Sequence, residues 1–150
     1  MKNGKEIKLY NILFPIWFIL LIPTAWIVIL PVNFIVDSLV ILIGMKIIGI
    51  NSKWKMYKRS ILKVWIFGFI SDIIGSLVML GALYVNDGIR GDELYLTIPA
   101  VMIAAIFIFI FNYFISFKYC DRREKFIMSI FLAVMTAPYT FMIPLNWIYY

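Results

Sequence analysis

Two aspartates lie within otherwise apolar stretches of this sequence, and they are the residues best able to do chemistry. Asp37 is the one ionisable side chain between Leu9 and Met45, and Asp72 lies nine residues beyond Lys63 in a later apolar stretch. By helical rise they would lie roughly 8 Å and roughly 13 Å below the nearer membrane boundary. A carboxylate at such depth costs about 2.5–3.5 kcal/mol, so each should face the protein interior or water and is a candidate proton or cation site.

Polar and small side chains recur at helical spacing around both aspartates. Asn33, Asp37 and Gly44 would share one helix face, and Asp72 would share another with two glycines. We therefore predict a small polar cavity centred on Asp72, lined by Asp37, Asp72, Asn33, Ser71, Asn112 and Thr136. Small residues let helix backbones approach closely, and the predicted helix-packing face consists of Gly68, Gly75, Ser129, Ala133 and Ala137.

The same residues have a purely structural interpretation. Asp37 and Asp72 would then hydrogen-bond to polar groups on neighbouring helices and hold the bundle together, although such bonds average only about 0.6 kcal/mol. A third interpretation is contact with another membrane subunit. The sequence leaves structural bonding, an ion pathway and subunit contact open.

Other chemistry lacks its residues. The chain has no histidine and a single cysteine, Cys120, which removes the commonest general base and the ligand sets of zinc sites. Phosphate-cradling glycine loops and nucleophile elbows do not occur in the sequence. We therefore expect no enzyme activity, no cofactor and no metal site.

The composition decides which elements must position the aspartates. Of the 150 residues, 64% are hydrophobic and 15% are charged, whereas soluble domains carry about 45–50% apolar and about 25% charged residues. A soluble enzyme, a disordered chain and a secreted disulfide scaffold are thereby disfavoured. The expectation is a single integral membrane domain over residues 1–150, all-α, with no soluble part.

Five transmembrane spans are predicted. The apolar stretch from Leu9 to Met45 would be roughly 55 Å long as one helix, too long for a single crossing of a roughly 30 Å core. Pro31-Val32-Asn33 near its middle is typical of a turn. The predicted spans are about 10–30, 32–48, 64–84, 96–117 and 126–147.

The distribution of basic residues supports this count. With five spans and the N-terminus inside, thirteen of the fourteen Lys and Arg lie on the cytoplasmic side and only Arg90 lies outside. A single crossing of residues 9–45 would instead give ten inside and four outside. The prediction is a cytoplasmic N-terminus and an external C-terminus. The net charge of +6 then indicates contact with anionic lipid at the inner face, not nucleic acid.

Several short segments carry a family resemblance. They are Phe14-Pro15-Ile16-Trp17, Leu30-Pro31-Val32-Asn33-Phe34, Asp37-Ser38-Leu39-Val40, Ser60-Ile61-Leu62-Lys63-Val64-Trp65, Phe67-Gly68-Phe69 with Asp72, Phe111-Asn112-Tyr113, Ser116-Phe117-Lys118 and Thr136-Ala137-Pro138-Tyr139. Together they resemble small polytopic integral membrane proteins of Gram-positive bacteria that have no established activity. The resemblance covers most of the chain and implies a bacterial plasma membrane, with nothing about a substrate.

These observations favour a compact five-helix bundle that acts as a small permease- or channel-like protein, or as a helper subunit of a membrane complex. The rival is a non-transporting interaction protein, such as an assembly factor or an immunity-type protector. Five helices leave little room to enclose a pathway, so a homodimer or another membrane subunit is an expected partner.

Overall fold

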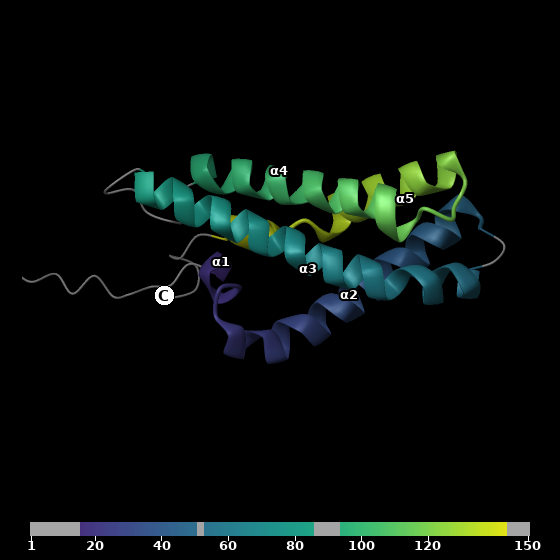
Figure 1. Cartoon of the computed structure of the whole chain (residues 1–150), viewed down its shortest axis with the longest axis horizontal. Coiled ribbons are helices and arrows are strands. Elements are labelled where there is room, and N and C mark those ends of the chain that lie inside the picture. The colour runs from purple at the N-terminus through teal and green to yellow at the C-terminus, as the bar shows by residue number, and fades with distance from the viewer. Residues whose placement is uncertain (1–15, 51–52, 86–93, 144–150) are drawn as a thin grey trace, which may run out of the picture.

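The computed structural model describes residues 16–50, 53–85 and 94–143, and within these ranges it contains helices and no strand. Four longer helices follow one another in an antiparallel arrangement, with a short helix before them (Figure 1). The elements are α1 (Ile16–Ile19), η1 (Pro23–Ala25), α2 (Trp26–Ile48), α3 (Lys53–Val85), α4 (Leu94–Phe111), η2 (Asn112–Ser116), α5 (Arg122–Thr136) and η3 (Tyr139–Met142).

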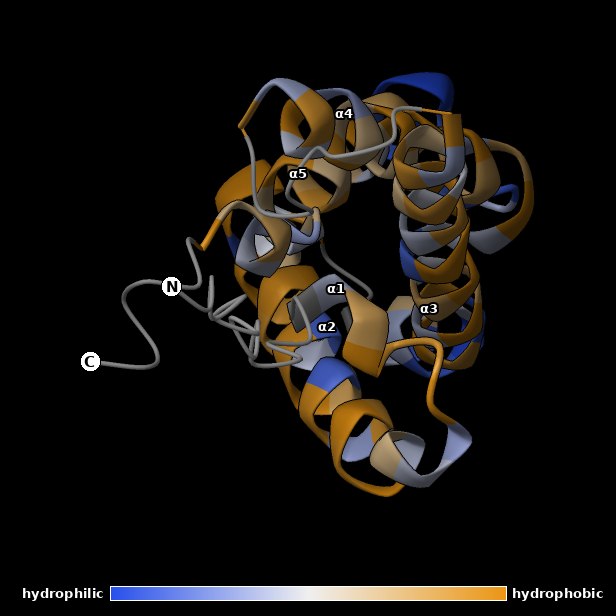
Figure 2. Ribbon diagram, turned by 90° about the vertical axis from the view of Figure 1, so that its left-hand side faces the viewer, coloured by the Kyte–Doolittle hydropathy of each residue, from blue (hydrophilic) through white to orange (hydrophobic). Residues whose placement is uncertain are grey.

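Four stretches of the described residues are long and apolar enough to cross a membrane: Pro23–Ile48, Trp54–Val85, Leu94–Ser116 and Arg122–Met142. Hydrophobic residues dominate the ribbons of the long helices when the bundle is viewed from one end (Figure 2). The chain therefore has the architecture of an all-helical, multi-pass membrane protein. The five-span count has four counterparts within these residues.

The predicted turn at Pro31-Val32-Asn33 is wrong, because α2 runs through it without interruption. Proline removes the donor for the carbonyl four residues earlier, and membrane helices tolerate this where neighbouring helices supply other partners. Trp65 on α3 is such a neighbour: its indole Nε1 donates to the carbonyl of Leu30, at 2.8 Å. The tryptophan thus ties α3 to α2 beside the proline.

The chain breaks earlier, between Leu20 and Ala25, where α1 ends and η1 forms. Residues 16–30 of the predicted first span therefore make α1, a turn, η1 and the first turn of α2, while residues 10–15 lie outside the described residues. The α1 residue Trp17 is almost fully buried. Ser76 of α3 donates to its carbonyl, at 3.2 Å, so α1 packs onto the side of α3.

Basic residues gather at one end of the bundle. Every Lys and Arg within the described ranges lies near the end of α2, in the first third of α3, or between the end of α4 and the start of α5. The antiparallel order brings these three regions together (Figure 1). We call this the basic end. Here α2 terminates at Gly49, which adopts a left-handed φ of 78° that glycine accepts without steric penalty.

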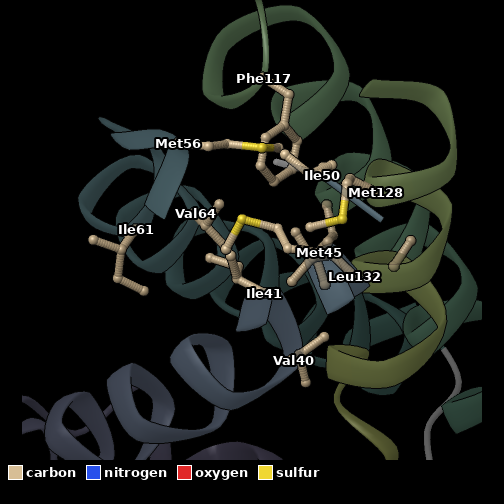
Figure 3. Close-up of a cluster of buried hydrophobic side chains, with 12 residues drawn as sticks. Val40, Ile41, Met45, Ile50, Met56, Ile61, Val64, Phe117, Met128 and Leu132 are labelled. Atoms are coloured by element: carbon tan, nitrogen blue, oxygen red, sulfur yellow. The ribbon is translucent and has the colours of Figure 1, made fainter. Parts of the chain in front are cut away.

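Two clusters of buried apolar side chains fill the bundle. The first lies toward the basic end and combines residues of α2, α3, α4 and α5 with Phe117 (Figure 3). The second, toward the other end, joins Trp17 and Leu20 to α3, α4 and Phe141. Because lipid is as apolar as these side chains, close van der Waals packing holds the helices together. A Cβ on Gly75 would lie 3.2 Å from the Ala104 Cβ, which shows how closely α3 and α4 approach.

The last turn of the third crossing is not an α-helix. Residues Asn112–Ser116 form a π-helix, closed by a bond from the Phe117 N–H to the Asn112 carbonyl, at 3.0 Å. Nδ2 of Asn112 donates to the carbonyl of Ile108, at 2.8 Å, and so competes for the acceptor that an α-helix would give to the Asn112 backbone. Such single-turn π segments often occur at functional sites.

Candidate functional site

Two carboxyl groups from neighbouring helices meet inside the bundle. Asp37 of α2 is 5% exposed and Asp72 of α3 is 9% exposed. A Cβ placed on Gly68 would lie 3.5 Å from Oδ2 of Asp37, so the α3 backbone passes directly against this carboxyl. The charges of the two aspartates interact electrostatically. We call Asp37 and Asp72 the carboxyl pair.

The carboxyl pair lies between the two apolar clusters along the chain. On α3, Val64 belongs to the first cluster and Met79 to the second, and Asp72 lies between them. On α2, Val40 belongs to the first cluster while Leu30 packs against the second, with Asp37 between them. The polar pair thus occupies the junction between two apolar packing units.

The hydrogen bonding of the carboxyl pair is incomplete. Oδ1 of Asp72 is buried and has no hydrogen-bond partner among the described residues. Ser76, one turn along α3, donates to the backbone carbonyl of Asp72, at 3.0 Å, and leaves the carboxyl without that donor. A buried polar atom without a partner costs about 1–3 kcal/mol, and such an atom is a natural place for a proton or a small cation to bind.

The structure places the other predicted polar residues as follows. Asn33 is half-buried, one helical turn before Asp37 on the same face of α2. The hydroxyls of Ser71 and Thr136 donate to carbonyls of their own helices, at 2.7 and 2.9 Å. Asn112 also donates within its own helix, but its Oδ1 is buried without a partner in the described part of the chain. Three of these four side chains therefore spend a donor on their own helix.

The predicted packing residues lie at helix contacts. Gly68 faces the carboxyl of Asp37, and Gly75 faces α4. Ser129, Ala133 and Ala137 are buried in or just after α5. The hydroxyl of Ser129 has no hydrogen-bond partner among the described residues, so this side chain is a polar group inside the bundle as well as a small one.

Sequence reasoning missed the polar contacts that aromatic residues make between α2 and α3. The Tyr57 hydroxyl donates to Oγ of Ser38, at 3.0 Å, and Trp65 donates to the Leu30 carbonyl. Buried Tyr and Trp usually find a hydrogen-bond partner for their polar atom. Their occurrence in the apolar stretch that contains Asp72 was the available signal.

Ionisable ligands for a metal do not gather in this site. No group of three or more His, Cys, Asp or Glu that could hold a metal ion occurs within residues 16–50, 53–85 and 94–143. Two carboxyls with nearby amide and hydroxyl oxygens suit a proton or a weakly held monovalent cation better than a tightly bound divalent one.

No protein-family model, no curated protein and no solved structure matches this chain. The function has to be inferred from the geometry of the carboxyl pair.

Proposed function

We propose that this protein is a small multi-pass membrane protein whose carboxyl pair binds a proton or a monovalent cation, as a permease- or channel-like protein or as the ion-binding helper of a larger membrane complex. The observation that carries the proposal is the meeting of Asp37 and Asp72, both at least nine-tenths buried, on adjacent membrane-crossing helices. Ionisable residues at such depth commonly mark proton relays and ion paths.

The electrostatics of the carboxyl pair support this proposal. Two negative charges repel each other strongly where water is scarce. The pair is therefore most stable when a proton or a cation is shared between the two carboxyls. Exchange of that ion for one from the opposite side of the membrane is the elementary step of a transporter.

The orientation belongs to the same proposal. With the basic end in the cytoplasm, all ten Lys and Arg of the described residues face inward, as the positive-inside rule requires. Anionic lipid headgroups would then lie around the basic end, with each nearby Lys or Arg contributing about 1 kcal/mol.

A carbodiimide experiment tests whether the carboxyl pair holds a proton. Dicyclohexylcarbodiimide reacts with protonated carboxyls in apolar surroundings, and mass spectrometry locates the modified residue. We expect labelling at Asp72 or Asp37 at about pH 7, lost in the Asp72→Asn and Asp37→Asn double variant. Asp121→Asn is the matched control, because Asn caps a helix as well as Asp does. Wild-type protein that stays unlabelled at every pH from about 5 to about 8 would refute proton binding.

Flux measurements test transport itself. Proteoliposomes that contain a pH-sensitive dye report proton movement, and cation gradients imposed across the membrane report coupling. We expect wild type and Asp121→Asn to dissipate the gradient and each single carboxyl-pair variant to fail. Absence of flux in the wild type, or equal flux in all variants, would remove the transport function.

An apolar groove favours a second candidate function, that of a non-transporting interaction protein. The groove encloses about 530 Å³ on α2 and α3, and it is lined by Trp26, Ile27, Leu30, Pro31, Phe34, Ile35 and Trp65. Ile27 is 79% exposed at its edge. A photo-crosslinking residue in place of Ile27 would capture a specific membrane partner if this candidate is right. Capture of lipid alone, together with flux that needs the carboxyl pair, would exclude it.

A further inference from the structure

A pocket opens at the basic end, away from the carboxyl pair. It encloses about 360 Å³ and lies where the end of α2, the start of α3, the segment after η2 and the start of α5 meet. Its lining consists of Gly49, Ile50, Lys55, Met56, Arg59, Ser60, Ser116, Tyr119, Cys120 and Glu124. We call this cavity the basic-end pocket. Its volume falls within the usual range of small-molecule sites.

Positive charge dominates one wall of the basic-end pocket. Lys55 and Arg59 both line it, one helical turn apart on α3. The Arg59 guanidinium also lies 5.8 Å from the ring centre of Tyr119, and Lys63 lies 5.3 Å from the same ring. A hydrogen bond with Lys118, reinforced by the charges of the surrounding cations, lowers the pKa of the Tyr119 hydroxyl. The wall is therefore strongly electropositive.

The floor of the basic-end pocket carries a polar atom without a partner. Ser116, which is 3% exposed, lines the pocket, and its Oγ forms no hydrogen bond to any described residue. By contrast, the hydroxyl of neighbouring Ser60 donates to the carbonyl of Met56. The Ser116 hydroxyl is thus available to a ligand from inside the bundle, while Lys55 and Arg59 approach that ligand from the surface.

The one acid in the lining is already engaged. Glu124 forms a capping box with Asp121 at the start of α5, accepting from the Asp121 N–H at 3.4 Å. Its carboxylate therefore serves the helix cap, and the two cations of the lining remain to attract an anion. Arginine presents a planar set of donors that matches phosphate oxygens, with the lysine acting as a second charge.

We propose that the basic-end pocket binds a phosphate group, held by Arg59 and Lys55 and hydrogen-bonded by the Ser116 hydroxyl. The position of the pocket, where the helices leave the apolar layer, is the depth at which lipid phosphates lie. A phospholipid headgroup and a soluble phosphate share this chemistry. The proposal does not depend on ion binding by the carboxyl pair.

The single cysteine of the chain is a built-in reporter for this site. Cys120 lines the basic-end pocket and is partly buried, so a bound ligand should shield it from a small alkylating reagent. Burial, and secondarily the charges of Glu124 and Asp121, raises the pKa of the Cys120 thiol to about 11. The assay is therefore run at about pH 9, where roughly 1% of the thiol is ionised and alkylation is slow enough to follow.

The probes separate the two sources of phosphate. The protein is held in dodecyl maltoside micelles, which contain no phosphate, and N-ethylmaleimide is added with inorganic phosphate, with phosphatidic acid or with diacylglycerol. A ligand at ten times its dissociation constant slows alkylation about elevenfold, by the factor 1 + [L]/Kd. Protection by inorganic phosphate supports a soluble ligand, and protection by phosphatidic acid but not diacylglycerol supports a lipid headgroup. Protection by neither phosphate probe overturns the proposal.

Variants connect the protection to the proposed residues. Arg59→Gln, Lys55→Gln and Ser116→Ala should each weaken binding, with a loss of about tenfold to a hundredfold for the cations, the range expected for a lost charge-assisted hydrogen bond. Lys58→Gln is the matched control, because the Lys58 ammonium lies 5.1 Å from the ring centre of Trp54 and does not line the pocket. Equal protection in Arg59→Gln, Lys55→Gln and the Lys58→Gln control would overturn the site, and circular dichroism verifies that each variant is folded.

Discussion

Adding a single methyl group at Gly75 tests the contact between α3 and α4. A Cβ there would lie 3.2 Å from the Ala104 Cβ, 3.2 Å from Cε2 of Phe141 and 3.3 Å from the carbonyl oxygen of Ala100. The carbonyl belongs to the α4 backbone and cannot rotate away. We therefore expect Gly75→Ala to push α3 and α4 apart and to lower the free energy of unfolding.

The magnitude follows from two opposing contributions. Overpacking a close contact costs about 1–3 kcal/mol, whereas Gly→Ala within a helix gains up to about 1 kcal/mol from helix propensity. The net change at Gly75 is then a loss of up to about 2 kcal/mol. Gly81 supplies the control on the same helix, because a Cβ there meets nothing within 4 Å. Gly81→Ala carries the propensity gain alone, so the difference between the two variants isolates the overpacking.

The assay is unfolding by SDS titration of the protein in detergent micelles, followed by far-ultraviolet circular dichroism. Gly75→Ala should be less stable than Gly81→Ala by about 1–3 kcal/mol. If the two variants unfold at the same SDS fraction, or if Gly75→Ala is the more stable, the close approach of α3 and α4 is refuted.

Three further predictions use the same preparation. Gly44→Ala should destabilise by less than Gly75→Ala when unfolding is compared, since its closest neighbour is the flexible sulfur of Met128, at 2.9 Å, and a larger loss would contradict this. Trp65→Phe should cost about 0.6 kcal/mol in SDS unfolding, the average for a hydrogen bond between membrane helices, through loss of the bond to Leu30; no change would show that the bond contributes nothing. Alkylation of Cys120 should accelerate about tenfold per pH unit between about pH 8 and 10, because burial, followed by two nearby carboxylates, raises its pKa to about 11 and keeps the thiol protonated across that range. At about pH 8 the SDS-unfolded chain should react roughly tenfold faster, since the thiolate becomes about a hundredfold more abundant but less nucleophilic; equal rates would contradict the raised pKa.

The helical membrane architecture could be predicted from the sequence, because hydropathy and the spacing of charged residues are local properties. The break in the first apolar stretch could not. Whether Pro31 interrupts a helix depends on what lies beside it, and here the indole of Trp65, thirty-four residues away in the chain, donates to the neighbouring carbonyl of Leu30. Turn chemistry alone carries no information about such a distant donor.

The candidate site shows the same limit. Depth alone predicted that Asp37 and Asp72 would avoid lipid, and both are buried. Helical spacing also grouped Ser71 and Thr136 with them, yet these hydroxyls donate to their own helices, as Ser and Thr commonly do in apolar surroundings. The basic-end pocket was not predicted, since its residues come from four separate segments that only the tertiary structure unites.

The π-helical turn at Asn112–Ser116 has a consequence for how the third crossing can vary. One residue more than an α-helical turn shifts the phase of everything after it by about 100°, and Ser116 and Phe117 are both buried as a result. A single-residue deletion within this turn would restore an ordinary helix and rotate the exit of the crossing against the rest of the bundle. One codon gained or lost here would therefore change which side chains the third crossing presents at the membrane surface, without altering the residues that hold the four crossings together.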